Sequence, residues 1–195
     1  MYFKKGRYRF VFVFPSLGIA VKFPVVCLFM AIKGLFWDIR GCEFYQAYKR
    51  MTVSVDAGAV IMGYKNILFG GVVANWREFL FYCRTKNVFL QQTYFSFFGL
   101  VNIQKAGEPS GVGVNTFWPW IREITGWHDR SDVGVYESPH HFMNPDNYCR
   151  DNCKLKFLDY GDRKVQAVIV KWGARIQESF DPSRDWSDPP RTETK

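Results

Sequence analysis

The sequence has 195 residues, which is enough for one domain or two very small ones. Its composition, 48% hydrophobic and 23% charged, excludes a mostly disordered, collagen-like or coiled-coil protein. The net charge of +8 favours an anionic partner, such as a nucleotide, a nucleic acid or a membrane face, without choosing among these.

The N-terminal residues and the cysteines bear on cellular location. The five cysteines are odd in number and irregularly spaced, which favours a reducing, cytoplasmic setting over a disulfide framework. Basic residues precede the apolar run 10–21, as in a signal peptide, but Pro15 interrupts the run and Lys22 follows it where a cleavage site is needed. Lysines also keep each apolar segment shorter than the roughly 20 residues of a transmembrane helix. We therefore expect a cytoplasmic protein with no membrane partner.

The first third of the chain begins with a predicted β-hairpin. Residues 8–26 contain two apolar, β-branched and aromatic runs joined by a Pro-Ser-Leu-Gly turn. Residues 28–39 and 43–51 then have patterns compatible with helices. Residues 53–61 and 67–73 are apolar and punctuated by glycine, and they are compatible with strand or loop.

A clearer helix is predicted to begin at Asn75. Asn75 as N-cap and Glu78 three residues later form a capping-box pattern, and the helix is expected to end at residues 85–87. Two strands, 93–98 and 100–104, are predicted next, with a glycine between them.

The C-terminal part is expected to alternate loops with short elements. Residues 105–113 have the composition of a loop or hinge, and residues 118–125 that of a short helix closed by a glycine. A short strand is predicted at 155–158, and apolar residues from Val165 onwards have the spacing of one helix face. The polar tail from Asp181 is predicted to be unfolded.

The stretch richest in chemical information is HHFMNPDN at residues 140–147, followed twelve residues after Asn147 by Asp159-Tyr160-Gly161. This order resembles the active-site segment of protein-kinase-like phosphotransferases, H-R-D-x-K-P-x-N, then a hairpin, then D-F-G. His140 matches the family's His, Pro145 its Pro and Asn147 its metal-binding Asn.

The resemblance implies ATP and Mg²⁺ as cofactors. Mg²⁺ takes hard oxygen ligands beside the nucleotide phosphates, and a hairpin brings the residues that flank it together. Asn147 and Asp159 are therefore the expected metal ligands. Upstream, Ala20-Val21-Lys22 resembles the V-A-I-K strand, so Lys22 would hold phosphates and Glu78 would pair with it.

The implied fold is α+β, a truncated two-lobed protein-kinase-like fold with an antiparallel N-lobe sheet, a packed helix and a small, mainly helical C-lobe. Residues 1–113 would form the N-lobe region, with 27–74 as an insertion longer than the family usually allows. Residues 114–180 would form a minimal C-lobe and 181–195 a flexible tail.

Three departures from the family pattern bear on activity. Phe142 occupies the position of the catalytic Asp and cannot accept a proton, so only His141 or Asp146 could act on an acceptor. No G-x-G-x-x-G precedes Lys22, and no A-P-E segment follows Gly161. The expectation is an ATP-binding pseudokinase or an atypical phosphotransferase.

Bland interpretations of the same residues stay open. Lys22 could be an ordinary strand-edge lysine, Lys33 in Met-Ala-Ile-Lys could take its role, and Glu78 could simply cap its helix. Asp159 could cap a turn. A non-catalytic interaction scaffold with a protein partner is then the alternative function.

Two further partner classes come from other clusters. The His and Cys residues near the hairpin have side chains that could bind zinc: His140, His141, Cys149 and Cys153, with His128 as a further candidate. The C-x₃-C spacing differs from the C-x₂-C spacing of the usual zinc knuckle. Residues 2–12 mix aromatic and basic side chains as in binders of single-stranded nucleic acid, without any known nucleic-acid motif.

Overall fold

The structure is a computed structural model that describes residues 1–6, 8–26, 28–41, 43–52, 63–126, 135 and 138–188. The chain divides into two compact units, each formed by more than one segment. Unit 1 comprises Met1–Arg84, Gln92–Ala106 and Tyr160–Arg163. Unit 2 comprises Thr85–Gln91, Gly107–Asp159 and Lys164–Lys195.

Unit 1 contains an antiparallel five-stranded sheet with the strand order β1-β2-β3-β5-β4. The predicted hairpin at its centre is confirmed, because β2 pairs with β3 around a short 3₁₀ turn, η1. The two predicted strands after residue 92 are confirmed as well. The elements are β1 (Tyr2–Lys5), β2 (Arg9–Phe14), η1 (Pro15–Leu17), β3 (Ile19–Pro24), β4 (Thr93–Phe97) and β5 (Val101–Lys105).

The two faces of this sheet differ in an unusual way. Successive side chains of each strand point to opposite faces of the sheet. The buried face carries polar side chains such as Lys22, Asn102 and Gln104. The opposite face carries aromatic residues that stay exposed, among them Phe3, Phe95 and Phe97. The buried face of the sheet therefore includes several polar side chains.

Helix α3 (Tyr64–Thr85) packs on the buried face of the sheet. Gly71 permits the close approach, because a Cβ at this position would lie 2.2 Å from the Tyr8 carbonyl oxygen and 2.9 Å from the Pro24 Cβ. The prediction of strand or loop for residues 67–73 is therefore wrong. Their glycines lower helix propensity, and tertiary packing overrides this local preference.

The predicted start of the helix at Asn75 is also wrong. Asn75 lies in the middle of α3, and its side-chain Nδ2 donates to the Gly99 carbonyl oxygen at 3.0 Å. A polar residue followed by Glu three positions later imitates a capping box, but here both side chains face the sheet. The helix ends at Thr85 as predicted.

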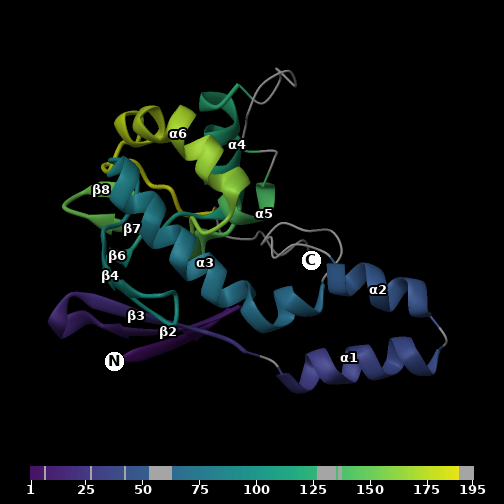
Figure 1. Ribbon diagram of the computed structural model, residues 1–195. Helices are drawn as coiled ribbons and strands as arrows, with labels where there is room; N and C mark the ends of the chain where they lie inside the picture. Colours follow the sequence, from purple (N-terminus) through teal and green to yellow (C-terminus); the bar gives the residue numbers. More distant parts are fainter. Residues whose placement is uncertain are drawn as a thin grey trace, which may run out of the picture. The chain divides into compact units, whose positions relative to one another are not determined.

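The two helices predicted for residues 28–39 and 43–51 are confirmed as α1 (Leu28–Arg40) and α2 (Phe44–Thr52). They pack against each other beside the rest of unit 1, and we call them the two-helix arm (Figure 1). Residues 53–62, which include the segment predicted as strand or loop, lie outside the described residues.

In its described residues, unit 2 combines three α-helices with a three-stranded antiparallel sheet, β6-β7-β8. Its β7–β8 hairpin is the one that the sequence predicted, with Asn152 and Cys153 at positive φ in a two-residue turn. The elements are β6 (Glu108–Pro109), α4 (Val114–Ile124), α5 (Pro139–Phe142), the 3₁₀ turn η3 (Pro145–Asn147), β7 (Tyr148–Asp151), β8 (Lys154–Phe157) and α6 (Arg163–Glu178).

The core of unit 2 is rich in aromatic rings, and it includes part of the C-terminal tail. Trp186 is buried, its Nε1 donates to the Asp181 carbonyl oxygen at 2.7 Å, and its ring contacts Phe117 and stacks on Phe180. The prediction of an unfolded tail is therefore wrong for residues 181–188. The polar composition of the segment favours disorder, but the large apolar area of its one tryptophan anchors it in the core.

These elements make the chain an α+β protein, as predicted, with six α-helices among the residues that the structure describes. None of the helices in the described ranges has both the length and the apolar character needed to cross a bilayer.

Candidate functional site

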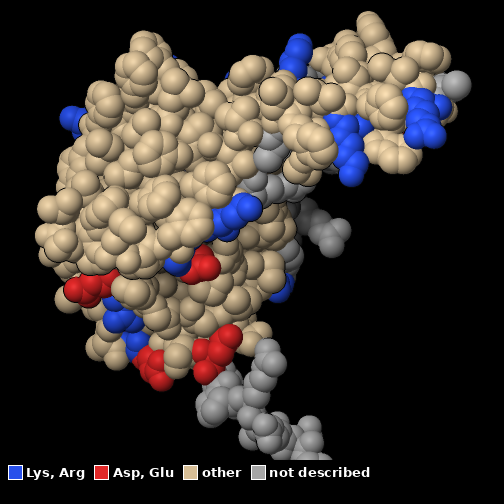
Figure 2. Space-filling model, turned by 90° about the horizontal axis from the view of Figure 1, so that it is seen from below, with Lys and Arg blue, Asp and Glu red and all other residues tan. Residues whose placement is uncertain are grey.

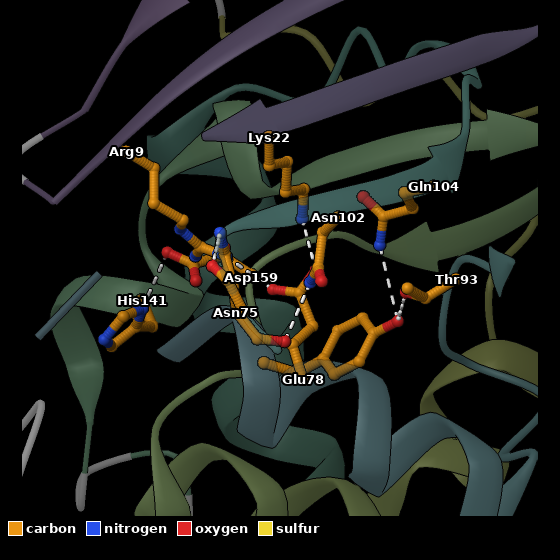
Figure 3. A network of polar contacts seen from close by, with 11 residues as sticks. Arg9, Lys22, Asn75, Glu78, Thr93, Asn102, Gln104, His141 and Asp159 are labelled. Atoms are coloured by element: carbon orange, nitrogen blue, oxygen red, sulfur yellow. Dashed lines mark hydrogen bonds and ion pairs between the residues drawn. The ribbon is translucent and has the colours of Figure 1, made fainter. Parts of the chain in front are cut away.

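Glu78 is the centre of a charged cluster inside unit 1 (Figure 3). Its Oε1 lies 2.5 Å from the Lys22 Nζ of β3, and its Oε2 lies 2.6 Å from an Arg9 guanidinium nitrogen of β2. The Lys22–Glu78 pairing expected from the sequence is therefore present, between residues 56 positions apart. We call Arg9, Lys22 and Glu78 the Glu78 cluster.

The Glu78 cluster is almost free of solvent. The side chains of Glu78, Lys22 and Arg9 are 0%, 5% and 11% exposed. Removing a carboxylate from water costs several kcal/mol, which only close cations and hydrogen bonds can offset. Two cations on one carboxylate satisfy that requirement and fix the orientation of the Lys22 ammonium.

A buried amide network supports the cluster from α3 and β5. The Asn102 Nδ2 donates to the Asn75 backbone carbonyl at 2.8 Å, and the Arg9 guanidinium reaches the Asn75 Oδ1 at 3.4 Å. Lys22 and Asn102 are cross-strand partners in the sheet. These bonds tie the strand that carries Lys22, the neighbouring strand and the helix that carries Glu78 to each other.

Tyr160 of the Asp-Tyr-Gly turn is anchored in unit 1. Its hydroxyl lies 2.7 Å from the Thr93 Oγ1 and accepts from the Gln104 Nε2 at 3.4 Å. Burial raises the pKa of this phenol well above its usual value, and the nearby Glu78 charge raises it further. Gly161 lets the turn pass α3, since a Cβ there would lie 2.7 Å from the Ala74 carbonyl oxygen.

In unit 2, Asn147 lies where the β7–β8 hairpin opens. Its backbone carbonyl accepts from the Leu158 N–H at 2.8 Å, which extends the ladder by one pair and brings Asn147 opposite the residue before Asp159. The Asn147 Nδ2 donates to the His141 carbonyl oxygen at 2.9 Å. This bond fixes the orientation of the amide group.

His141 connects Asn147 with Asp159. Besides accepting from Asn147, His141 places its Nδ1 3.4 Å from the Asp159 Oδ2 (Figure 3). The two side chains are 16% and 29% exposed, so solvent reaches this group more than it reaches the Glu78 cluster. We call His141, Asn147 and Asp159 the Asp159 cluster.

The other residues of the kinase-like segment have mainly structural surroundings. Phe142, at the position of the family's catalytic Asp, is fully buried and stacks on Phe157 at 5.1 Å between ring centroids. Asp146 is exposed on η3, where its N–H bonds the Asn144 side chain. His140 contacts the His141 ring. Of the two acceptor-activating candidates, only His141 thus belongs to the Asp159 cluster.

The zinc alternative gains no support from the described residues, among which no group of three or more His, Cys, Asp or Glu side chains could hold a metal. Cys149 is buried, whereas Cys153 is exposed at the hairpin turn. His128 lies outside the described residues. The pair expected for magnesium has only one Asn and one Asp, so it is smaller than the groups of three or more considered for zinc.

Sequence reasoning missed three contributors to these clusters. The composition around Arg9 indicates only an aromatic and basic segment, but strand alternation puts Arg9 on the same face as Lys22, and this is the signal that the sequence offers. The pattern at Asn75 indicates a helix cap, and the pattern at Asn102 indicates an ordinary strand residue. Their partners come from other elements, and no local pattern announces them.

Comparisons with models of protein families, with curated proteins and with solved structures each found no match. The chain's own residues therefore carry the functional conclusion.

Proposed function

We propose that this chain is a kinase-like protein that binds ATP with Mg²⁺ and has lost ordinary phosphoryl transfer, in the manner of a pseudokinase. Lys22 interacts with the nucleotide phosphates, Glu78 holds Lys22 in place, and Asn147 and Asp159 supply oxygen ligands to Mg²⁺. The truncated two-lobed fold implied by the resemblance is part of the same proposal.

The observation that carries the proposal is the Lys22–Glu78 ion pair. The kinase-like pattern required a lysine on an early strand to meet a glutamate on the following long helix, and the two side chains lie 2.5 Å apart. A fully buried carboxylate that aligns a lysine is costly for stability alone, since apolar residues of similar volume often serve as well. Selection for a functional lysine would explain its retention.

The donor set of the Asp159 cluster fits Mg²⁺. A carboxylate and an amide oxygen are hard ligands, and a Mg²⁺ site in phosphotransferases commonly uses one or two side chains together with substrate phosphates. The Asn147 amide is oriented by its bond to the His141 carbonyl oxygen, and the Asp159 carboxylate is partly exposed. When bound, Mg²⁺ would neutralise phosphate charge.

The loss of transfer is inferred from Phe142. A buried aromatic ring can neither accept a proton nor orient a hydroxyl, so the usual base is missing. His141 could serve only as an atypical base, and its Nδ1 is directed at Asp159. We expect binding without measurable turnover.

A thermal-shift titration tests the binding. ATP with Mg²⁺ should stabilise the wild-type protein by about 2.7 kcal/mol at a hundredfold excess over Kd. Asp159→Asn should lose the Mg²⁺-dependent part, and Lys22→Met should lose most of the shift with and without Mg²⁺. Lys154→Gln, an exposed lysine on β8, is the matched control and should behave as wild type.

Two results would contradict the proposal. The first is a wild-type protein that ATP and Mg²⁺ do not stabilise, which would leave the interaction scaffold as the better interpretation. The second is a shift that Lys22→Met and Lys154→Gln reduce equally, because this would indicate non-specific attraction of an anion to a basic protein. Since Lys22→Met lowers stability itself, the ligand-induced shift is compared and not the midpoint.

A further inference from the structure

The two-helix arm of unit 1 is held together by small and polar residues. Ala31 of α1 and Ala47 of α2 are buried, and the Asp38 carboxylate pairs with the Arg50 guanidinium at 3.1 Å and accepts from the Tyr64 hydroxyl. Large apolar residues have little part in this interface. They are therefore available on the outside of the arm.

Helix α1 presents a continuous apolar stripe to solvent. Its members follow the spacing i, i+1, i+4, i+8 and i+11, which is one side of a helix. All of them are exposed, from 47% for Ile39 to 76% for Phe29. The stripe consists of Leu28, Phe29, Ile32, Phe36 and Ile39. A stripe of this kind marks an interaction surface, because proteins rarely expose several large apolar side chains side by side.

Helix α2 adds a second exposed aromatic stripe. Phe44, Tyr45 and Tyr48 lie on one side of this helix, and all three are more than half exposed. Trp37 of α1 is exposed as well, with the Arg40 guanidinium 5.9 Å from its ring. Tryptophan and tyrosine are the residues that favour the boundary between water and lipid.

The exposed charges of the arm are mostly positive. Lys33 and Arg40 border the apolar stripe of α1, and Lys49 borders the aromatic stripe of α2. The acid within α1, Asp38, is buried and paired with Arg50. On the face seen in Figure 2, the arm shows Lys and Arg and no Asp or Glu. Each helix of the arm thus combines exposed apolar side chains with bordering basic ones.

We propose that the two-helix arm is a docking element for the surface of an anionic phospholipid bilayer. Amphipathic helices with aromatic and leucine-type residues on one face and lysine or arginine beside them insert that face at the headgroup boundary. The long stems of Lys33 and Lys49 let the ammonium groups reach lipid phosphates while the stripe enters the acyl region.

Charge decides for this occupant over a second copy of the chain. A second copy would bring another set of lysines and arginines to the contact, and like charges would repel. An anionic bilayer attracts basic residues close to its surface. The proposal concerns an interfacial position, and it departs from the expectation of no membrane partner, which rested on spanning and exported segments.

Vesicle flotation with the full chain tests the proposal. The wild-type protein should float with vesicles of phosphatidylcholine and phosphatidylserine, and only weakly with vesicles of phosphatidylcholine alone. Phe29→Ser combined with Phe36→Ser should lower the affinity by more than about tenfold. Lys33→Gln combined with Lys49→Gln should lower the affinity by about thirtyfold. High salt should also lower the affinity of the wild-type protein for anionic vesicles.

Two controls keep the result specific. Leu17→Ser removes an exposed apolar residue at the β2–β3 turn, and Lys154→Gln removes an exposed lysine in unit 2. Both should float as wild type, and all variants should keep the wild-type circular dichroism and ATP response. If the aromatic double variant fails to fold, the lysine double variant still decides the question.

The proposal is overturned if the wild-type protein ignores anionic vesicles, or if the control variants lose binding as much as the arm variants. It is also overturned if sedimentation shows a dimer that Phe29→Ser with Phe36→Ser converts to a monomer without a change in flotation. That result would assign the stripe to a second copy of the chain. Because ATP binding is read separately, the membrane and nucleotide proposals can fail independently.

Discussion

The Glu78 cluster and the Asp159 cluster use similar chemistry in different surroundings. Both bring a carboxylate to a nitrogen base, at 2.5 Å for Lys22–Glu78 and at 3.4 Å for His141–Asp159. Glu78 is 0% exposed and has two cations, whereas Asp159 is 29% exposed. Short, buried ion pairs with two cations fix the geometry of the carboxylate, whereas longer, more exposed pairs allow the carboxylate to exchange its partner.

This difference agrees with the proposed roles, in which Glu78 positions Lys22 and Asp159 binds a metal ion. A buried carboxylate cannot lose its partner without a large cost, so the Glu78 cluster is coupled to the stability of unit 1. A partly exposed carboxylate pays little to exchange a histidine for a metal ion, because water already screens the pair. The two clusters should therefore respond very differently to matched substitutions.

The largest effect is expected for Glu78→Gln. This change leaves Lys22 and Arg9 buried without their carboxylate, and breaking a buried pair by removing one partner costs about 3–5 kcal/mol. Urea unfolding of the wild type and the variant measures the difference in the free energy of unfolding.

Glu123→Gln on α4 is the matched control, because Glu123 is exposed and its loss should change stability by less than about 0.5 kcal/mol. A loss below about 1 kcal/mol for Glu78→Gln would show that water reaches the cluster in solution. The contrast between the two clusters would then disappear.

A smaller effect is expected at alkaline pH, where a buried tyrosine reports on each unit. Burial raises the pKa of both Tyr160 in unit 1 and Tyr148 in unit 2 well above the usual value, and Glu78 adds to the shift of Tyr160. Below about pH 10 each phenol is protonated in the folded and the unfolded chain, so its stabilising contribution is fully present. Above this pH the unfolded chain loses the proton first, so stability falls by about 1.4 kcal/mol per pH unit for each group.

Unfolding measured between neutral and strongly alkaline pH checks this dependence. Tyr160→Phe and Tyr148→Phe should each make the fall of the free energy of unfolding with pH shallower, by the contribution of one titrating proton. Glu78→Gln should lower the pH at which the contribution of Tyr160 levels off and leave that of Tyr148 unchanged, because the Glu78 charge raises the pKa of Tyr160 and does not act on Tyr148. Equal responses of the two tyrosines to Glu78→Gln would argue against the electrostatic coupling.

Much of the fold could be predicted from local patterns. The central hairpin, the helices α1 and α2, the strands before and after Gly99 and the hairpin before Asp159 each have a period or turn chemistry of their own. The first half of α3 could not be predicted in this way, because Gly71 is required by the approach of Tyr8 and Pro24, which are distant in sequence. Trp186 was missed for a similar reason, since its partners lie on other elements.

The candidate site was predictable where a motif fixes the order of residues. The spacing between Asn147 and Asp159 gave the hairpin, and the order of Lys22 and Glu78 gave their pairing. Arg9, the second cation on Glu78, was not found, although the pairing of Arg9 with Pro24 puts it on the face of Lys22. For side chains that meet only through tertiary packing, the sequence offers only indirect signals such as this alternation along a strand.

The smallest effect on stability is expected for Asp159→Asn, and this smallness is informative. The amide keeps the shape of the side chain and removes one half of a partly exposed pair, so the free energy of unfolding should change by less than about 1 kcal/mol. The same variant should lose the Mg²⁺-dependent stabilisation by ATP, since an amide oxygen is a weaker magnesium ligand than a carboxylate. Urea unfolding with and without the nucleotide separates these two quantities in one experiment. A large loss of stability without ligand would mean that Asp159 acts as a structural group like Glu78, whereas an unchanged response to Mg²⁺ would contradict its proposed role as a metal ligand.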